Sequence, residues 1–201
     1  MTLNGPFASP RRVARLLDGF SCPWALCGGW AIDCFLGRVT RPHKDVDVAI
    51  LRSDQLEIQA YLRARGWTLE KAHAGRLTPW KDGELIQLPV HGVWCRRPDH
   101  DPDFLELLLN EATATEFCFR RDPSVTLPLE RAFLRSSGGL PILAPEIALL
   151  YKVAHPELAE NRADFESAMP HLSPKSRAWL TAALARVYPE HDWLRDLRCT
   201  A

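Results

Sequence analysis

Two aspartates lie two residues apart inside an apolar run, and they constrain the fold more than any other feature. Asp45 and Asp47 alternate with Val46 and Val48 within residues 44–51. In an extended strand, residues i and i+2 point to the same face, so this spacing predicts a strand with both carboxylates on one face and valines on the core side. Neighbouring carboxylates repel each other unless a cation lies between them, and carboxylate oxygens are ligands that Mg²⁺ prefers. The pair therefore predicts a metal site on a buried strand.

A pair of glycines precedes the aspartates and predicts a place for phosphate. Gly28 and Gly29 follow the short apolar run 24–27 and open a helical pattern over 30–36, which Gly37 ends. Glycine lets a ligand approach the backbone closely, and the N-terminus of a helix favours negative charge. A lone glycine pair is usually only a turn, and a lone Asp-x-Asp usually lies on a solvated loop. Their combination, with a buried strand around the acids, favours a phosphate and metal site.

A third carboxylate, Glu106, lies in the apolar run 104–109, where it shares a strand face with Phe104 and Leu108. It could complete the metal site or accept a proton from an attacking group. The alternative is an edge residue that faces solvent, and Glu111 and Glu116 are weaker substitutes. A phosphate cradle, a metal and a base together describe nucleotidyl transfer, in which a hydroxyl attacks the α-phosphorus of a nucleoside triphosphate and pyrophosphate leaves.

These motifs resemble those of the DNA polymerase β-like nucleotidyltransferase superfamily. The run from Gly28 to Asp33, followed by the run from Gly37 to Asp47, is similar to the aminoglycoside and lincosamide adenylyltransferases, and most of all to the aminoglycoside 2''-nucleotidyltransferase type. The close similarity covers about residues 26–50. The resemblance implies an enzyme that uses ATP or another nucleoside triphosphate and Mg²⁺, of a kind associated with antibiotic resistance.

Carried onto this chain, the resemblance implies a role for each motif. The glycine pair would hold the triphosphate, and Asp45 and Asp47 would bind Mg²⁺. The third acid of the family falls on Glu106, although the family usually has aspartate there. A lysine on a C-terminal helix contacts the nucleotide phosphates in related enzymes, and Lys152 is the candidate here.

Basic residues just before the aspartates have two interpretations. Arg38, Arg41, His43 and Lys44 could neutralise a triphosphate, since arginine suits phosphate geometry. They could equally form a solvated loop that pairs with nearby acids. For Asp33, a cap or a pairing with Arg38 or Arg41 is favoured, and His43 is expected at the surface.

Composition excludes few functions. The 201 residues carry 25 lysines and arginines against 25 aspartates and glutamates, and this neutrality argues mildly against a dedicated nucleic-acid-binding protein. No run approaches the length of about 18 apolar residues that a membrane span needs, so we predict a cytoplasmic protein with no membrane partner. The six cysteines form no C-x-x-C pair, so neither a zinc site nor a disulfide framework is expected.

The pattern along the chain predicts an α/β (α+β) polymerase β-like fold, with a mixed sheet flanked by helices and a small C-terminal helical part. We divide it into a nucleotidyltransferase domain over 1–135 and a helical subdomain over 140–201, with a flexible joint at 136–139. Expected helices cover 54–65, 145–154, 159–169 and 174–187. Expected strands cover 24–27, 44–51, 67–72, 76–80, 85–88, 90–96 and 104–109.

The leading hypothesis is a Mg²⁺-dependent nucleotidyltransferase, most simply an adenylyltransferase, which modifies a hydroxyl of a small molecule. An aminoglycoside-like acceptor rests on the resemblance alone, because one scaffold serves many acceptors. A toxin-like enzyme that modifies tRNA or protein is an alternative, as is a catalytically silent nucleotide-binding regulatory module. The sequence leaves open the preferred base and whether the chain forms a homodimer with a shared cleft.

Overall fold

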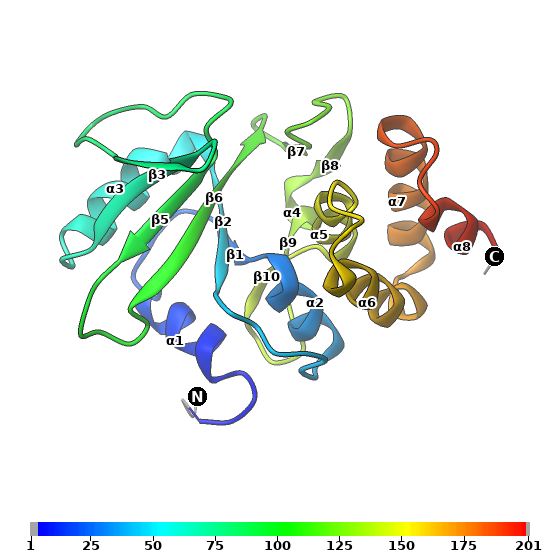
Figure 1. The fold of residues 1–201 in the computed structure, drawn as a ribbon, viewed down its shortest axis with the longest axis horizontal. Coiled ribbons are helices and arrows are strands. Elements are labelled where there is room, and N and C mark those ends of the chain that lie inside the picture. The colour runs from blue at the N-terminus through cyan, green and yellow to red at the C-terminus, as the bar shows by residue number, and fades with distance from the viewer. Residues whose placement is uncertain (1–3, 200–201) are drawn as a thin grey trace.

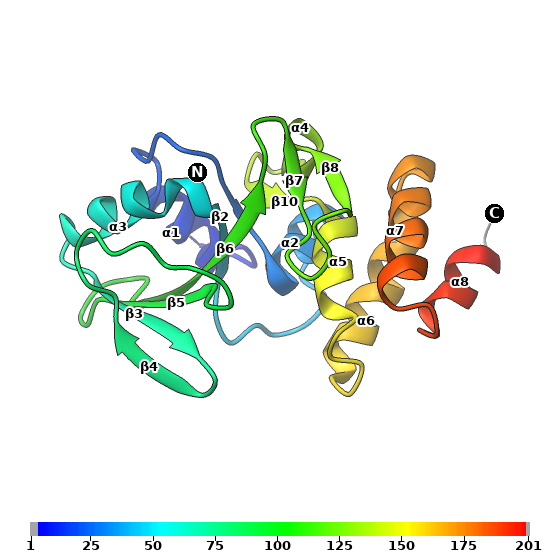
Figure 2. The same ribbon diagram turned by 90° about the horizontal axis from the view of Figure 1, so that it is seen from above.

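A mixed sheet forms the centre of the computed structural model, which describes residues 4–199. Its main path runs β4-β3-β5-β6-β2-β1-β10-β9, with β7 and β8 attached to the far end of β6 (Figures 1 and 2). The β2·β6 and β1·β10 pairs are parallel and the others are antiparallel. The strands are β1 (Trp24–Leu26), β2 (Asp47–Leu51), β3 (Thr68–His73), β4 (Arg76–Pro79), β5 (Gly92–Arg96), β6 (Phe104–Ala112), β7 (Glu116–Cys118), β8 (Thr126–Pro128), β9 (Phe133–Arg135) and β10 (Pro141–Leu143).

The helices lie on both sides of this sheet, as the sequence predicts for a mixed α/β fold. Helices α1 and α3 lie on one side of the molecule, and α5, α6, α7 and α8 gather at the other, toward the C-terminus (Figures 1 and 2). They are α1 (Ala8–Leu16), α2 (Gly28–Leu36), α3 (Gln55–Arg63), α4 (Leu129–Ala132), α5 (Pro145–Lys152), α6 (Ala159–Ala168), α7 (Pro174–Val187) and α8 (Trp193–Cys199), with 3-10 turns at Arg52–Asp54 and Met169–His171.

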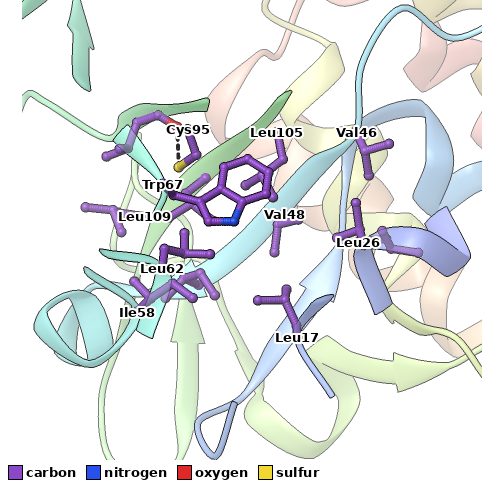
Figure 3. Packing of buried hydrophobic residues seen from close by; sticks show 14 of the residues in the cluster. Leu17, Leu26, Val46, Val48, Ile58, Leu62, Trp67, Cys95, Leu105 and Leu109 are labelled. Atoms are coloured by element: carbon purple, nitrogen blue, oxygen red, sulfur yellow. Dashed lines mark hydrogen bonds between the residues drawn. The ribbon is translucent and has the colours of Figure 1, made fainter. Parts of the chain in front are cut away.

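The strand alternation of β2 fixes which side of the sheet carries the core. Val48 and Ile50 are fully buried in one cluster with Ile58 and Leu62 of α3, and Val46 joins them (Figure 3). Ala49, between the two, belongs to a different cluster formed with β7, β8, α4 and α5. Burial of such aliphatic side chains stabilises the fold by about 1.5–3 kcal/mol each. Asp47 lies two residues before Ala49 and therefore on the same face of the strand. Its carboxylate points away from the core that packs against α1 and α3.

The C-terminal helices pack together and onto α2. Leu149 of α5, Phe165 of α6 and Leu184 of α7 share a cluster with Ile32 of α2. Ser173 caps α7, since its hydroxyl accepts a hydrogen bond of 3.1 Å from the backbone N–H of Ser176. The short final helix α8 was not expected from the sequence.

Strand β10 crosses the boundary that the sequence suggests. Residues 136–139, expected to form a flexible joint, are the turn between β9 and β10, and β10 pairs in parallel with β1 through Ile142 and Leu26. The division into two domains stays a prediction. Strand β10 of the proposed helical subdomain is hydrogen-bonded to β1 of the proposed nucleotidyltransferase domain.

Residues 85–88 form no strand, which corrects the sequence prediction. Their backbone is tied instead to side chains of α3, because Ile86 N–H donates to Gln55 Oε1 at 2.6 Å. The neighbouring Gly83 N–H donates to Gln59 Oε1 at 2.8 Å. Two buried glutamines thus replace a strand partner, and hydrophobic alternation could not reveal them. Over residues 4–199, no helix is long and apolar enough to cross a membrane.

Candidate active site

Asp47 and Glu106 are register partners on the parallel pair β2·β6. Each follows the alternation of its strand, with buried Val48 and Leu107 as the next register pair. Both carboxylates therefore lie on the sheet face opposite the α1·α3 core. The structure thus joins two acids that are far apart in the sequence.

Proximity of these acids changes their proton affinity. Burial and, after it, the charge of Asp45 raise the pKa of Asp47 to about 6. Burial, followed by the charges of Asp47 and Asp45, raises the pKa of Glu106 to about 7. Three carboxylates that repel one another create a region where a cation is favoured and where one acid can hold a proton near neutral pH.

Asp45 lies outside the strand that was predicted to carry it, because β2 begins at Asp47. Strand pairing ends here: the last backbone contact before β2 is Glu106 N–H to Val46 O at 3.2 Å. The chain at Asp45 is held by a side chain instead, since Trp30 Nε1 donates to the Asp45 carbonyl oxygen at 3.0 Å. Asp45 is thus presented from a loop, although it remains close enough to act on the other two acids.

Close packing requires both glycines, Gly28 against the acidic site and Gly29 against the basic loop before β2. Gly28 begins α2 with φ +60°, and a Cβ there would overlap Asp47 Oδ2 and lie 3.3 Å from Asp47 Cγ. A Cβ on Gly29 would overlap Arg41 Nη2 and lie 2.6 Å from His43 Cε1. The start of α2, where backbone N–H groups have no helical acceptor, therefore directly adjoins the carboxylate of Asp47.

Arg41 is directed to a buried acid of the C-terminal part. Its Nε and Nη2 donate to Asp164 Oδ1 and Oδ2, each at 2.9 Å, and this hydrogen bonding raises the pKa of Arg41. Lys152 Nζ lies 2.8 Å from Asp164 Oδ2 and donates to Asn161 Oδ1 at 3.1 Å. The fully buried Asp164 thus links the loop before β2 to helix α5.

Asp33 and His43 form a second anchor of the same loop, which corrects two expectations. Asp33 pairs with neither of the predicted arginines: it accepts hydrogen bonds from the N–H and hydroxyl of Thr40, and its Oδ2 lies 2.6 Å from His43 Nε2. Burial would raise the pKa of Asp33, but the bonds to His43 and Thr40 lower it overall. The His43 side chain is 5% exposed and stacks on Trp30, with ring centroids 4.1 Å apart. It is therefore no surface histidine.

A cavity of about 280 Å³ brings together Gly28, Asp47 and Lys152. Arg120, Arg121 and Tyr151 also line it, and the sequence alone does not predict a role for them. The only local signal was a pair of arginines directly after a buried aromatic residue. With one acid against several cations, this cavity has an excess of positive charge.

A second cavity, of about 470 Å³, has the opposite character. Its lining includes the carboxylates of Asp45, Asp103 and Glu106, with Trp94 and Phe104 as aromatic walls. The lining also contains Arg96, whose guanidinium pairs with Glu70 at 2.9 Å. The acidic pair Asp47 and Glu106 therefore contributes to two hollows of opposite charge.

Three predicted nucleotide-binding residues, Gly29, Arg41 and Lys44, do not line the first cavity. Lys44 is exposed and lines a smaller hollow of about 160 Å³ with Trp30, His43 and Asp45. Arg41 packs against Gly29 and is paired with the buried Asp164. Their roles toward a nucleotide stay predictions.

The acids fit a magnesium ion that a substrate helps to hold. Among residues 4–199 no group of three or more His, Cys, Asp or Glu side chains has the arrangement of a complete metal site. Mg²⁺ commonly takes only one or two protein carboxylates, with waters and substrate phosphates as its other ligands. Asp45 and Asp47, beside the start of α2, offer such a pair. The roles of Asp45, Asp47 and Glu106 stay predictions.

Comparison with known proteins agrees with the resemblance read from the motifs. The sequence profile of the family described as Aminoglycoside-2''-adenylyltransferase matches residues 11–96. Proteins named 2''-aminoglycoside nucleotidyltransferase from Escherichia coli and Klebsiella pneumoniae are each 36% identical over 55 residues, or 27% of this chain. That alignment spans 31% of the relatives' own length.

Similarity of fold extends over nearly the whole chain. The solution structure of the antibiotic-resistance factor ANT(2'')-Ia gives a TM-score of 0.60 at 17% identity, with 95% of each chain covered. Its crystal structure with adenylyl-2''-tobramycin gives 0.57 at 16% identity, over 88% of this chain and 95% of that one. The lincomycin-bound lincosamide adenylyltransferase LnuA gives 0.53 at 14% identity, over 77% and 90%. The predicted nucleotidyltransferase fold is confirmed.

Proposed function

We propose that the protein is a Mg²⁺-dependent nucleotidyltransferase that transfers AMP from ATP to a hydroxyl group of a small cationic acceptor of the aminoglycoside class. The observation that carries this proposal is the pairing of Asp47 with Glu106 on neighbouring strands, with Asp47 packed against Gly28 at the start of α2. A phosphate cradle in contact with a metal-binding acid is the arrangement that phosphoryl chemistry needs. The matched profile and the names of the relatives support the same reaction class.

Asp45 and Asp47 are the residues that would hold Mg²⁺, which when bound neutralises charge on the phosphates and polarises the α-phosphorus. The triphosphate occupies the cation-rich cavity, with its oxygens on the α2 N-terminus and near Lys152. The carboxylates of Asp45 and Asp47 repel each other in the free protein, and a Mg²⁺ ion that binds with the nucleotide removes this repulsion. Binding of the two is therefore expected to be cooperative.

Glu106 is the base in this proposal. The acceptor hydroxyl oxygen attacks the α-phosphorus, the bond from that phosphorus to the bridging oxygen breaks, and pyrophosphate leaves. The proton of the hydroxyl passes to Glu106, whose pKa of about 7 suits proton acceptance at neutral pH. Its opposite neighbour across β5·β6 is Trp94, a wall of the acidic cavity, so the base faces the space in which we place the acceptor.

The acidic cavity favours a cationic acceptor over RNA. Asp45, Asp103 and Glu106 surround it, so the phosphates of a polynucleotide would meet three carboxylates there. The aromatic side chains Trp94 and Phe104 also line it, with the Arg96 guanidinium 4.8 and 5.5 Å from their ring centroids. A small amino sugar suits the acidic part of this lining.

The test is pyrophosphate release with each nucleoside triphosphate, Mg²⁺, and in turn aminoglycosides, lincosamides, tRNA and protein. We expect release only with ATP and an aminoglycoside, and a loss of about 100-fold or more in Asp47→Asn. The control is Glu57→Gln, an exposed acid on α3, which should keep wild-type rates. Labelling of tRNA alone would overturn the acceptor, and ATP binding without turnover on any acceptor would favour a regulatory module.

A further inference from the structure

Arg120 lies at the wall of the cation-rich cavity and is not used by the reaction described above. It follows β7 and the fully buried Phe119, and it lines the same cavity as Gly28, Asp47 and Lys152. Arg120 is half-buried, so its guanidinium is partly shielded from water at the edge of the proposed triphosphate site.

Other cations near this cavity have acidic or carbonyl partners. Arg52 Nε lies 2.6 Å from Glu111 Oε1, and Lys152 Nζ lies 2.8 Å from Asp164 Oδ2. No carboxylate of residues 4–199 lies within ion-pair distance of Arg120. Glu111, the acid that acts on Arg120 electrostatically, is already paired with Arg52.

The immediate surroundings of Arg120 are aromatic and cationic. Its guanidinium lies 5.8 Å from the ring centroid of Tyr151, and its backbone N–H donates to the Tyr151 hydroxyl at 3.5 Å. Arg121, next in the chain, donates to Tyr151 O at 3.1 Å and to the Tyr188 hydroxyl at 3.3 Å. Burial, with the charges of Arg121 and Arg52 acting the same way, lowers the pKa of Arg120.

A cation held in this way is unfavourable for the free protein. Partial removal from water costs free energy, and a carboxylate partner normally offsets it. Arg120 lacks that partner while it faces the cavity next to the helix N-terminus and Lys152. An anionic ligand in this cavity would supply the missing charge, and the guanidinium fork matches phosphate oxygens.

We infer that Arg120 binds the β- and γ-phosphates of the nucleotide and then the leaving pyrophosphate. The inference rests on the proposed function, because it takes the cavity of Gly28 and Lys152 as the triphosphate site. Arg120 is a binding residue for the leaving group, not for the base, the α-phosphate or the acceptor. The acceptor cavity does not include it.

The test compares Arg120→Gln and Arg120→Lys with the control Arg76→Gln, which removes an exposed arginine of β4 remote from the cavity. Binding of ATP, pyrophosphate and AMP is measured by calorimetry with Mg²⁺ and no acceptor, and thermal unfolding is measured in parallel. We expect Arg120→Gln to weaken ATP and pyrophosphate by about 10- to 100-fold, the value of one or two charge-assisted hydrogen bonds, and to leave AMP unchanged. Arg120→Lys should recover part of the loss, since it keeps the charge.

The melting temperature distinguishes a binding role from a structural role. Loss of a structural arginine would lower it. Removal of a desolvated cation without an acidic partner should leave the melting temperature of Arg120→Gln equal to or above that of the wild type. A variant that unfolds, or that binds ATP within about twofold of the wild type, or that loses AMP equally, overturns the inference. If the wild type binds neither ATP nor pyrophosphate, the proposed function fails and the inference fails with it.

Discussion

Substitution of Gly28 by alanine should separate backbone strain from damage to the active site. Gly28 has φ +60°, where an L-residue is disfavoured by about 1–2 kcal/mol, while loss of glycine freedom in the unfolded chain returns about 0.4–1 kcal/mol. The new Cβ would also overlap Asp47 Oδ2, and such overpacking costs about 1–3 kcal/mol more. The total is about 1–5 kcal/mol, or a fall in melting temperature of about 2–20 °C for a chain of this size.

Gly83→Ala is the matched control for this variant. Gly83 has φ +68° but nothing within 4 Å of its Cβ position, so the substitution adds strain without a clash. It should cost only about 0.5–1 kcal/mol and keep full activity. In Gly28→Ala the carboxylate of Asp47 must move, and a shift of about 1 Å in a catalytic group lowers turnover about 100-fold.

The assay is thermal unfolding of both variants together with steady-state pyrophosphate release. Equal melting temperatures for the two alanine variants would refute the packing argument. Wild-type turnover in Gly28→Ala would refute the claim that this glycine is needed because Asp47 lies against it.

Three further predictions concern charge. The value of kcat/KM should rise as the pH increases through about 7, because Glu106 accepts a proton only as the carboxylate. Glu106→Gln should remove this pH dependence. The pKa of Asp47 is raised on folding from 3.8 to about 6, so this acid favours the folded state below about pH 4, and that contribution is lost as pH rises through 6. Asp47→Asn without Mg²⁺ should therefore melt higher than the wild type at pH 8 and not at pH 4; equal melting temperatures at pH 8 would contradict the raised pKa. Asp164→Asn should lower the free energy of unfolding by about 3–5 kcal/mol in urea titration, because it leaves two cations without their buried partner, whereas the exposed Glu166→Gln on the same helix should change it little.

Local pattern was sufficient for the parts of the site that depend on neighbouring residues. The alternation of Asp47 with Val46 and Val48 predicted a strand with valines in the core, and the structure places both valines there. Gly37 ends α2 in the left-handed conformation, as its position in the sequence suggested. Asp45 differs because pairing with β6 begins only at Asp47, although β6 itself starts two residues earlier, at Phe104. The Asp45 carbonyl oxygen accepts a hydrogen bond from the Trp30 indole instead, a contact between segments that strand alternation does not predict.

Contacts between distant segments could not be derived from one sequence. The partners of Asp33 and Arg41 are brought near by the tertiary fold. Asp33 pairs with His43, and Arg41 pairs with Asp164 of α6. The missing strand at 85–88 has the same origin, since Gln55 takes over its backbone hydrogen bonding. Arg120 belongs to the cavity only because β7 returns beside β6, and the polar pattern around it gives no sign of this.

The register of Asp47 and Glu106 is the structural basis of the whole proposal, and mass spectrometry of the acceptor tests it most directly. The protein is incubated with ATP, Mg²⁺ and an aminoglycoside, and the acceptor is then analysed for addition of one adenylyl group. We predict adenylylated product with the wild type and with Glu57→Gln, and none above background with Asp47→Asn. Product formed at the wild-type rate by Asp47→Asn would contradict the account.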